Sequence, residues 1–215
     1  GGIVHLAAAS ARGARLIPPV LKTFSEKYPG IHVEIIEENS NDCIPLLLSG
    51  RVDLCLMAIS RSLTKLPTEF LRREEIYIAA SKSHPILAYA KPFPDSPEEY
   101  YVEPEDAAQF DFILTSPNTV LRTITEDLFA EHHLAIRSNY NSLSLDFALA
   151  MVEQNLGLLF IHESLVKSNE RVMRLSIGKK RLWRDLVIAY PTQQYRSKAT
   201  RAFAAEIHQA LDMTY

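Results

Sequence analysis

Apolar and polar positions follow two alternating periods along the first sixty residues. Residues 3–9, 31–36 and 52–58 form short apolar or alternating runs, which are typical of strands. Between these runs the apolar residues recur three and four positions apart, which predicts one helix from Ala14, after a turn at 10–13, and another that opens at 39–42. The resulting order β-α-β-α-β predicts a parallel sheet with right-handed crossovers.

The second half of the chain repeats this alternation. Strand-like runs at residues 110–114, 134–140 and 158–161 are separated by two stretches with helical spacing. Further strands are predicted at 76–80 and 186–190, and a final amphipathic helix carries Ala199, Phe203, Ile207 and Leu211. We therefore expect an α/β fold with two Rossmann-like lobes.

Residues 89–109 interrupt the pattern. They contain four prolines among acidic residues, namely Pro92, Pro94, Pro97 and Pro104. Because proline removes a backbone donor and fixes φ, this stretch predicts an exposed, mobile loop.

Small polar residues occupy four of the predicted strand-to-helix turns. They are Ser10, the group Asn39, Ser40 and Asn41, the pair Thr115 and Ser116, and Ser142 with Ser144. In parallel sheets, ligands bind at the carboxyl ends of strands, where helix N-termini favour carboxylates and other small anions. For any single turn, helix capping is the simpler interpretation. Four such turns divided between two lobes favour a binding cleft between the lobes.

Arginines lie close to these turns. Arg12 and Arg122 could bind an anionic ligand in a forked geometry, and Arg61 follows the third predicted strand. A solvated helix face or a structural ion pair is the alternative interpretation for each of them.

Composition and charge narrow the classes of function. The 215 residues carry a net charge of −3, whereas a free-standing DNA-binding domain is usually basic. Residues 1–5 lack a basic export signal, and no apolar run is long enough to span a bilayer, so we expect a cytoplasmic protein with no membrane partner. Cys43 and Cys55 lack CxxC spacing and are expected to be buried thiols in a reducing compartment.

Catalytic signatures are missing from the sequence. It contains no GxSxG, P-loop or HExxH motif, and no set of residues at metal-ligand spacing. We therefore expect no cofactor, no metal and no enzymatic activity, although residues distant in sequence can still meet in a cleft.

Four short segments, in order along the chain, resemble the effector-binding domains of LysR-type transcriptional regulators. They are Leu16-Ile17-Pro18 with Phe24 and Tyr28-Pro29-Gly30-Ile31, then Leu47-Leu48-Ser49-Gly50-Arg51-Val52-Asp53-Leu54, then Ser83-His84-Pro85-Ile86-Leu87-Ala88, and Asn155-Leu156-Gly157-Leu158-Leu159-Phe160. Each segment alone is weak, but together they cover nearly the whole chain.

The resemblance implies a type 2 periplasmic-binding-protein-like fold with two lobes joined by two crossing strands. Lobe I would comprise residues 1–75 and 191–215, and lobe II residues 76–190, with the crossing strands near 76–80 and 186–190. It further implies a small-molecule effector pocket between the lobes, lined by Ser10, Ala11, Ser40, Thr115, Ser116 and Ser142. We expect the effector to be a small, anionic metabolite.

The resemblance also implies partners. Homodimers or homotetramers are expected, in which the helix after the first strand meets helix 119–131 of the partner. DNA would be bound only by an N-terminal winged helix-turn-helix that lies outside these residues. Two departures from the family pattern are His162, where the family often has proline, and Cys43 and Cys55 in the first lobe, which disfavours thiol-based peroxide sensing.

Two other functions remain open on the same architecture. One is a solute-binding protein of a transport system, against which the missing export signal argues. The other is an enzyme built on this scaffold, such as a deaminase or dehydratase of aromatic precursors.

Overall fold

The computed structural model describes residues 1–60, 65–166, 169–192 and 195–213, without the side chains of residues 10, 11, 166 and 213. The chain divides into two compact units. Unit 1 comprises Gly1–Arg73 and Asp185–Tyr215, and unit 2 is the single stretch Glu74–Arg184.

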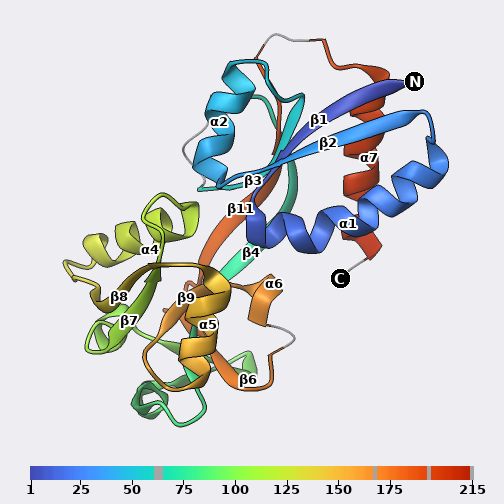
Figure 1. The fold of residues 1–215 in the computed structure, drawn as a ribbon. Coiled ribbons are helices and arrows are strands. Elements are labelled where there is room, and N and C mark those ends of the chain that lie inside the picture. The colour runs from blue at the N-terminus through green and yellow to red at the C-terminus, as the bar shows by residue number, and fades with distance from the viewer. Residues whose placement is uncertain (61–64, 167–168, 193–194, 214–215) are drawn as a thin grey trace. The chain divides into compact units, whose positions relative to one another are not determined.

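The chain passes between the units twice, within two long strands (Figure 1). It enters unit 2 within β4 (Thr68–Ser81) and returns to unit 1 within β11 (Leu182–Ala189). The crossing strands expected near residues 76–80 and 186–190 overlap β4 and β11.

Unit 1 contains the predicted β-α-β-α-β order. Its first elements are β1 (Gly2–Ala8), α1 (Ser10–Lys27), β2 (Ile31–Glu37), α2 (Ser40–Leu48) and β3 (Leu54–Ile59), and the chain returns to add the end of β11 and α7 (Lys198–Met213). β1 pairs in parallel with both β2 and β3, which confirms the predicted parallel sheet, while β11 pairs antiparallel with β3.

Helices cover both faces of the unit 1 sheet (Figure 1). On one face, α1 and α7 pack together through Phe24 and Phe203, whose ring centroids are 5.0 Å apart at an interplanar angle of 83°. On the other face, α2 buries Cys43 and Leu47 against the sheet. The apolar face predicted for α1 is confirmed, since Leu16, Ile17, Val20 and Phe24 are all buried.

The helix α1 begins at Ser10, four residues before the predicted start at Ala14. Its first turn was missed because residues 10–13 contribute no large apolar side chain to the helical spacing. The amide of Gly13 already donates to the carbonyl of Ala9 at 2.7 Å. A Cβ at Gly13 would lie 2.9 Å from the Cβ of Ala8, so glycine allows this first turn to pack closely on the end of β1.

Unit 2 combines an antiparallel part with a second β-α-β-α-β arrangement. Beyond β4, its elements are η1 (Pro85–Tyr89), β5 (Lys91–Phe93), β6 (Ser96–Val102), α3 (Pro104–Ala107), β7 (Asp111–Thr115), α4 (Val120–Glu131), β8 (Arg137–Leu143), α5 (Leu145–Glu153), β9 (Leu159–His162), α6 (Glu163–Val166) and β10 (Val172–Ile177). β7 and β8 pair in parallel, and a parallel bridge joins Phe112 of β7 to Leu158. The repeated order predicted for the second lobe is therefore confirmed.

The antiparallel part of unit 2 is built around β4. β9 and β10 both pair antiparallel with it, β6 pairs in parallel with β10, and β5 forms the sheet edge beside β6. A stacked pair of rings, Phe112 and Phe160 at 4.4 Å, lies in the core on one face, and Ala148 and Val152 of α5 cover the other face.

The loop predicted at residues 89–109 is wrong, because this stretch holds β5, β6 and α3. Pro92 lies in the edge strand β5, where proline is tolerated since one side of the strand needs no donor, and the register shifts beside it. Pro104 occupies the first turn of α3, where its missing amide has no helical acceptor. Pro92 therefore marks an edge strand and Pro104 a helix start, while Pro94 lies in the turn before β6 and Pro97 near the start of that strand.

Candidate functional site

The carboxyl ends of the parallel strands of unit 1 meet at one edge of its sheet. Backbone hydrogen bonds connect the turns that follow them: the amide of Ala9 donates to the carbonyl of Leu56 at 3.2 Å, and that of Glu38 to the carbonyl of Ala8 at 3.0 Å. The helices α1 and α2 both start at this edge, so their free N-terminal amide groups gather there.

Ser40 places a hydroxyl at this edge of unit 1. It is 7% exposed, and its Oγ accepts a hydrogen bond from the amide of Ala58 in β3 at 3.0 Å. The N-cap of α2 is Asn39, whose side chain makes no capping hydrogen bond. Ser40 thus joins the start of α2 to the end of β3, and a hydroxyl that accepts in this way can still donate its own proton.

The other predicted residues of unit 1 lie in the first turns of the same helices. Arg12 is 5% exposed in α1, and Asn41 is half-buried in α2. The side chains of Ser10 and Ala11, and the whole of Arg61, lie outside the described part of the structure.

In unit 2 the corresponding edge is formed by the carboxyl ends of β7 and β8. Thr115 is the last residue of β7 and Ser116 follows it, both half-buried. The helix α4 is capped by Thr119, whose Oγ1 accepts from the amide of Arg122 at 3.2 Å and donates to the carbonyl of Ser116 at 3.1 Å. Thr115 and Ser116 therefore do not cap the helix that follows them.

Arg122 holds this edge together. Its Nη1 donates to the carbonyl of Thr115 at 2.8 Å and to Oδ1 of Asn141 at 2.9 Å, while its Nε donates to Glu126 at 2.6 Å. The Arg122 side chain is only 11% exposed, so these bonds fix the ends of β7 and β8 relative to each other. Nearby, the cavity bordered by Thr115 and Arg122 has a volume of about 10 Å³, which is too small for an organic ligand.

The cap predicted across residues 141–144 is only partly right. The strand β8 continues to Leu143, and Ser144 alone caps α5 by accepting from the amide of Phe147 at 3.3 Å. Ser142 is exposed within the strand, with a φ of 61°. The sequence did not single out Thr119, although it lies only three positions after Ser116; Asn141 was expected to help cap α5 but instead accepts from Arg122.

Each unit therefore brings its own predicted residues to one edge of its sheet. Arg12, Ser40 and Asn41 share the edge of unit 1, and Thr115, Ser116, Arg122 and Ser142 share that of unit 2. A single cleft formed by both groups stays a prediction.

The two cysteines are buried, as predicted, in the core beneath α2. Both are completely buried, and Sγ of Cys55 lies 3.6 Å from the carbonyl oxygen of Cys43. The hydrogen bond with Cys43, followed by burial, raises the pKa of the Cys55 thiol far above its ordinary value. Since the thiolate is the reactive form, Cys55 is a poor nucleophile.

Among the described residues, no group of three or more His, Cys, Asp or Glu side chains could hold a metal ion. No helix in that part of the chain is long and apolar enough to cross a membrane.

Comparison with known proteins places the chain in a family. Residues 1–212 match the model of the LysR substrate binding domain. The chain is 24% identical to a probable RuBisCO transcriptional regulator of Chlorokybus atmophyticus, covering 96% of this chain and 66% of that protein. It is 22% identical to a probable nitrogen assimilation transcriptional activator of Synechococcus elongatus, covering 96% and 65%. The chain thus spans just under two thirds of the length of these relatives.

Solved structures show the same fold. The effector binding domain of QuiR in complex with shikimate superposes with a TM-score of 0.79 at 19% identity, covering 100% of this chain and 99% of that one. The CcmR regulatory domain of Synechocystis PCC6803 in complex with 2-PG gives a TM-score of 0.84 at 17% identity, with coverage of 100% and 99%. The type 2 periplasmic-binding-protein-like fold expected from the sequence is confirmed.

Proposed function

This chain belongs to the family of LysR substrate binding domains, and on that premise we propose that it senses a small-molecule effector for a DNA-binding transcriptional regulator. The observation that carries the proposal is the pair of polar sheet edges, one in each unit. Buried Ser40 lies at the first edge, and Thr115, next to the clamped Arg122, lies at the second. The two relatives described above match nearly the whole chain and are named as transcriptional regulators. Their names favour a sensor over a transport protein or an enzyme.

The effector that this chemistry favours is a small, anionic metabolite, and a carboxylate is the simplest form of it. Helix N-termini at each edge offer amide groups with partial positive charge. Arg12 adds a cation beside the start of α1. Benzoate and shikimate, the molecules bound by two proteins of the same fold, are carboxylates.

The proposed effector site combines residues from both edges. Unit 1 would supply Ser10, Ala11, Arg12, Ser40 and Asn41, and unit 2 would supply Thr115, Ser116, Arg122 and Ser142. We propose that Arg122 acts by positioning: its bonds to Thr115 and Asn141 would hold the end of β7 in place for the ligand.

Regulation would follow from the preference of the effector for one arrangement of the two units. A ligand shifts such an equilibrium only by its difference in affinity for the two arrangements. In a cytoplasmic homodimer or homotetramer, the shift would change the spacing of DNA-binding domains that lie outside this chain. The protein would thus respond to a metabolite without converting it.

Thermal melting in the presence of carboxylates tests the proposal. Benzoate, shikimate and succinate are titrated against the chain. An effector should raise Tm, because binding at a hundredfold excess over Kd raises the free energy of unfolding by about 2.7 kcal/mol. If no member of a wider carboxylate panel raises Tm, the anionic effector is wrong.

A paired variant tests the site itself. Ser40→Ala with Thr115→Val should abolish the Tm shift of any effector found, because it removes one hydroxyl from each sheet edge. The matched control is Ser25→Ala with Thr23→Val on the exposed side of α1, where both hydroxyls bond only to helix carbonyls. Effector affinity that is equal in the two double variants would refute the assignment.

A further inference from the structure

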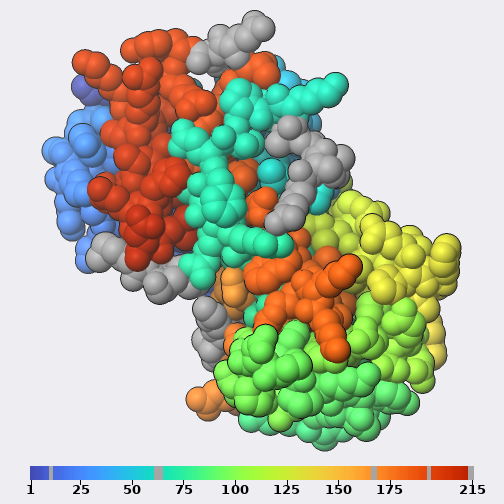
Figure 2. Space-filling view, turned by 180° about the vertical axis from the view of Figure 1, so that it is seen from behind, coloured from blue at the N-terminus to red at the C-terminus, as the bar shows by residue number. Residues whose placement is uncertain are grey.

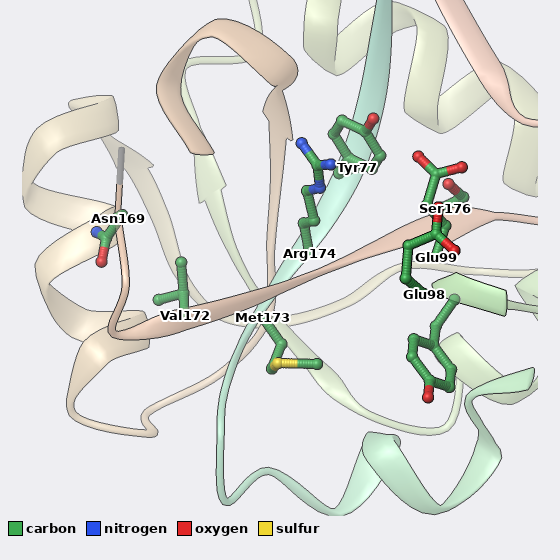
Figure 3. Close-up of a pocket in the computed structure, with 9 residues that line it drawn as sticks. Tyr77, Glu98, Glu99, Asn169, Val172, Met173, Arg174 and Ser176 are labelled. Atoms are coloured by element: carbon green, nitrogen blue, oxygen red, sulfur yellow. The ribbon is translucent and has the colours of Figure 1, made fainter. Parts of the chain in front are cut away.

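Unit 2 holds a second pocket, away from the residues assigned above. It has a volume of about 550 Å³ and is lined by side chains of β4, β6 and β10 (Figure 3). Small-molecule sites in proteins typically measure about 300–1,000 Å³, so this pocket has room for a small metabolite.

The pocket lies where β6 separates from β10. β10 pairs with β4 along residues 172–176, but it pairs with β6 only at Ser176 and Ile177. Upstream of Tyr101, the strand β6 pairs with β5 on its other side, which leaves a fork beside the first half of β10. Side chains from both faces of β10 reach this fork, and Figure 3 shows Arg174 and Met173 on opposite sides of the strand.

Arg174 is the cation of the pocket. Its guanidinium carbon lies 5.1 Å from the centroid of the Tyr77 ring, and the two side chains lie side by side in Figure 3. The Arg174 side chain is half-buried, and within the described part of the chain it forms neither a hydrogen bond nor an ion pair. Its donors are therefore available to an anion.

Glu98 and Glu99 supply negative charge on the β6 side of the pocket (Figure 3). Oε2 of Glu99 accepts from Nη2 of Arg181 at 2.7 Å, and this bond, with the charges of Arg181 and Arg174, holds the pKa of Glu99 below its ordinary value. Glu98 is exposed and makes no ion pair with any described residue. The pocket thus presents a cation and two carboxylates, and among the described residues no ion pair joins Arg174 to Glu98 or Glu99.

The rest of the pocket lining mixes polar and apolar groups. Asn169, Tyr100 and Ser176 add polar atoms, whereas Val172 and Met173 add aliphatic surface. Methionine adapts its shape to irregular ligands, so Met173 suits an apolar group.

We propose that this pocket is a second ligand site, which binds a small zwitterion of the α-amino acid class with an apolar side chain. The carboxylate pairs with Arg174 on one side of the fork, and on the other side the ammonium group pairs with Glu98 and the side chain packs on Met173. A simple carboxylate would leave the acidic side unpaired, and a simple amine would leave Arg174 unpaired. The site goes beyond the proposed effector site, since it is built from unit 2 alone.

Methyl NMR of the full chain labelled with [methyl-¹³C]methionine tests the proposal. L-Phenylalanine and L-leucine are the probes, with 3-phenylpropionate and 2-phenylethylamine as the analogues that lack one charge. The Met173 resonance, assigned with Met173→Leu, should shift saturably with the amino acids and less strongly with either analogue. Met57, buried in unit 1, should not move.

Variants then identify the groups that bind the ligand. Arg174→Gln and Glu98→Gln should each weaken amino acid binding by about tenfold or more, because each removes a charge-assisted contact. The controls are Arg137→Gln and Glu131→Gln, which change exposed charges elsewhere in unit 2. Ser40→Ala with Thr115→Val should leave this binding intact, which separates the present test from that of the effector site.

Three results would overturn the proposal. The first is no saturable shift of Met173 with either amino acid up to tens of millimolar. The second is undiminished affinity in both Arg174→Gln and Glu98→Gln. The third is equal or tighter binding of 3-phenylpropionate, which would make the pocket a carboxylate site.

Discussion

At the scale of single residues, the hydroxyls divide into those that cap helices and those that do not. Thr119 and Ser144 cap α4 and α5. Ser40 instead bonds to β3, and neither Thr115 nor Ser116 caps a helix. Helix capping, the simpler interpretation of these turns, therefore applies to Thr119 and Ser144. Ser40 and Thr115 do not cap a helix, so they remain candidates for binding the proposed effector.

Gly157 gives a prediction at the same scale. Its φ is 158°, and an added Cβ would lie 3.1 Å from Cγ1 of Ile113 and 3.2 Å from the carbonyl oxygen of Asp111. That carbonyl also accepts from the amide of Leu158, so it cannot move freely. Gly157→Ala should lower the free energy of unfolding by about 1–3 kcal/mol, measured by urea denaturation.

Gly178 is the matched control for this prediction. Its φ is 70°, but a Cβ there would meet no atom within 4 Å. Gly178→Ala should therefore cost only the backbone strain, about 1–2 kcal/mol, and less than Gly157→Ala. The opposite ranking would show that Ile113 and Asp111 adjust easily.

At the scale of elements, ion pairs connect strands of unit 2 that are far apart in sequence. Glu75 of β4 is 2% exposed in its side chain and accepts from Ser176 of β10 at 2.5 Å and from Arg181 at 2.8 Å. Arg181 also bonds to Glu99 of β6. These contacts hold together the three strands that border the pocket of Figure 3.

Removing the charge of Glu75 should weaken this part of the sheet. Glu75→Gln keeps the shape but loses charge-assisted bonds, so the free energy of unfolding should fall by about 1.5–3 kcal/mol in urea denaturation. Glu170→Gln, at an exposed position of the same unit, should change it little. Equal effects of the two variants would mean that the buried bonds add no net stability.

At the scale of the whole molecule, unit 1 is completed by the last part of the chain. Figure 2 shows the start of β4 (teal) alongside α7 (red), and Glu69 bonds there to Nε2 of His208 at 3.0 Å. Glu69 also bonds to Arg196 at 2.9 Å, and the Arg196 guanidinium lies 3.5 Å from the centroid of the Tyr190 ring. These contacts attach the returning chain to the segment that precedes unit 2.

The Glu69 contacts predict a dependence of stability on pH. Burial acts to raise the pKa of Glu69, but hydrogen bonds from His208 and Tyr190 and the charges of His208 and Arg196 outweigh it and hold the pKa below 4.5. A carboxyl with a lowered folded pKa stabilises the protein above its unfolded pKa, and this contribution is lost as pH falls through the folded pKa.

Urea denaturation at neutral pH and in acid checks this dependence. Glu69→Gln should be less stable than the unmodified chain at neutral pH, and the difference should shrink as pH falls below 4.5. Glu26→Gln, on the exposed side of α1, should show no such convergence. A difference that stays constant with pH would contradict the assignment.

Most of the elements outside residues 89–109, and their order, follow from the sequence, because strand and helix periods are properties of neighbouring residues. The alternation of β1, α1, β2, α2 and β3, and its repeat in unit 2, could therefore be predicted. So could the polar turns that hold Ser40 and Thr115. The prolines of residues 89–109 misled because the tolerance of proline depends on being at a sheet edge, which no local pattern records.

Which side chains meet depends on how distant parts of the chain pack. Glu75 and Arg181 lie 106 residues apart, and Ser40 bonds to a strand amide 18 residues later. The fork between β6 and β10, which pair only at Ser176 and Ile177, is not revealed by the alternation of residues in either strand. The physical reason is that the spacing of apolar residues along the sequence indicates which face of a helix or strand a side chain occupies. The residue that this side chain contacts is set by how elements distant in sequence pack together.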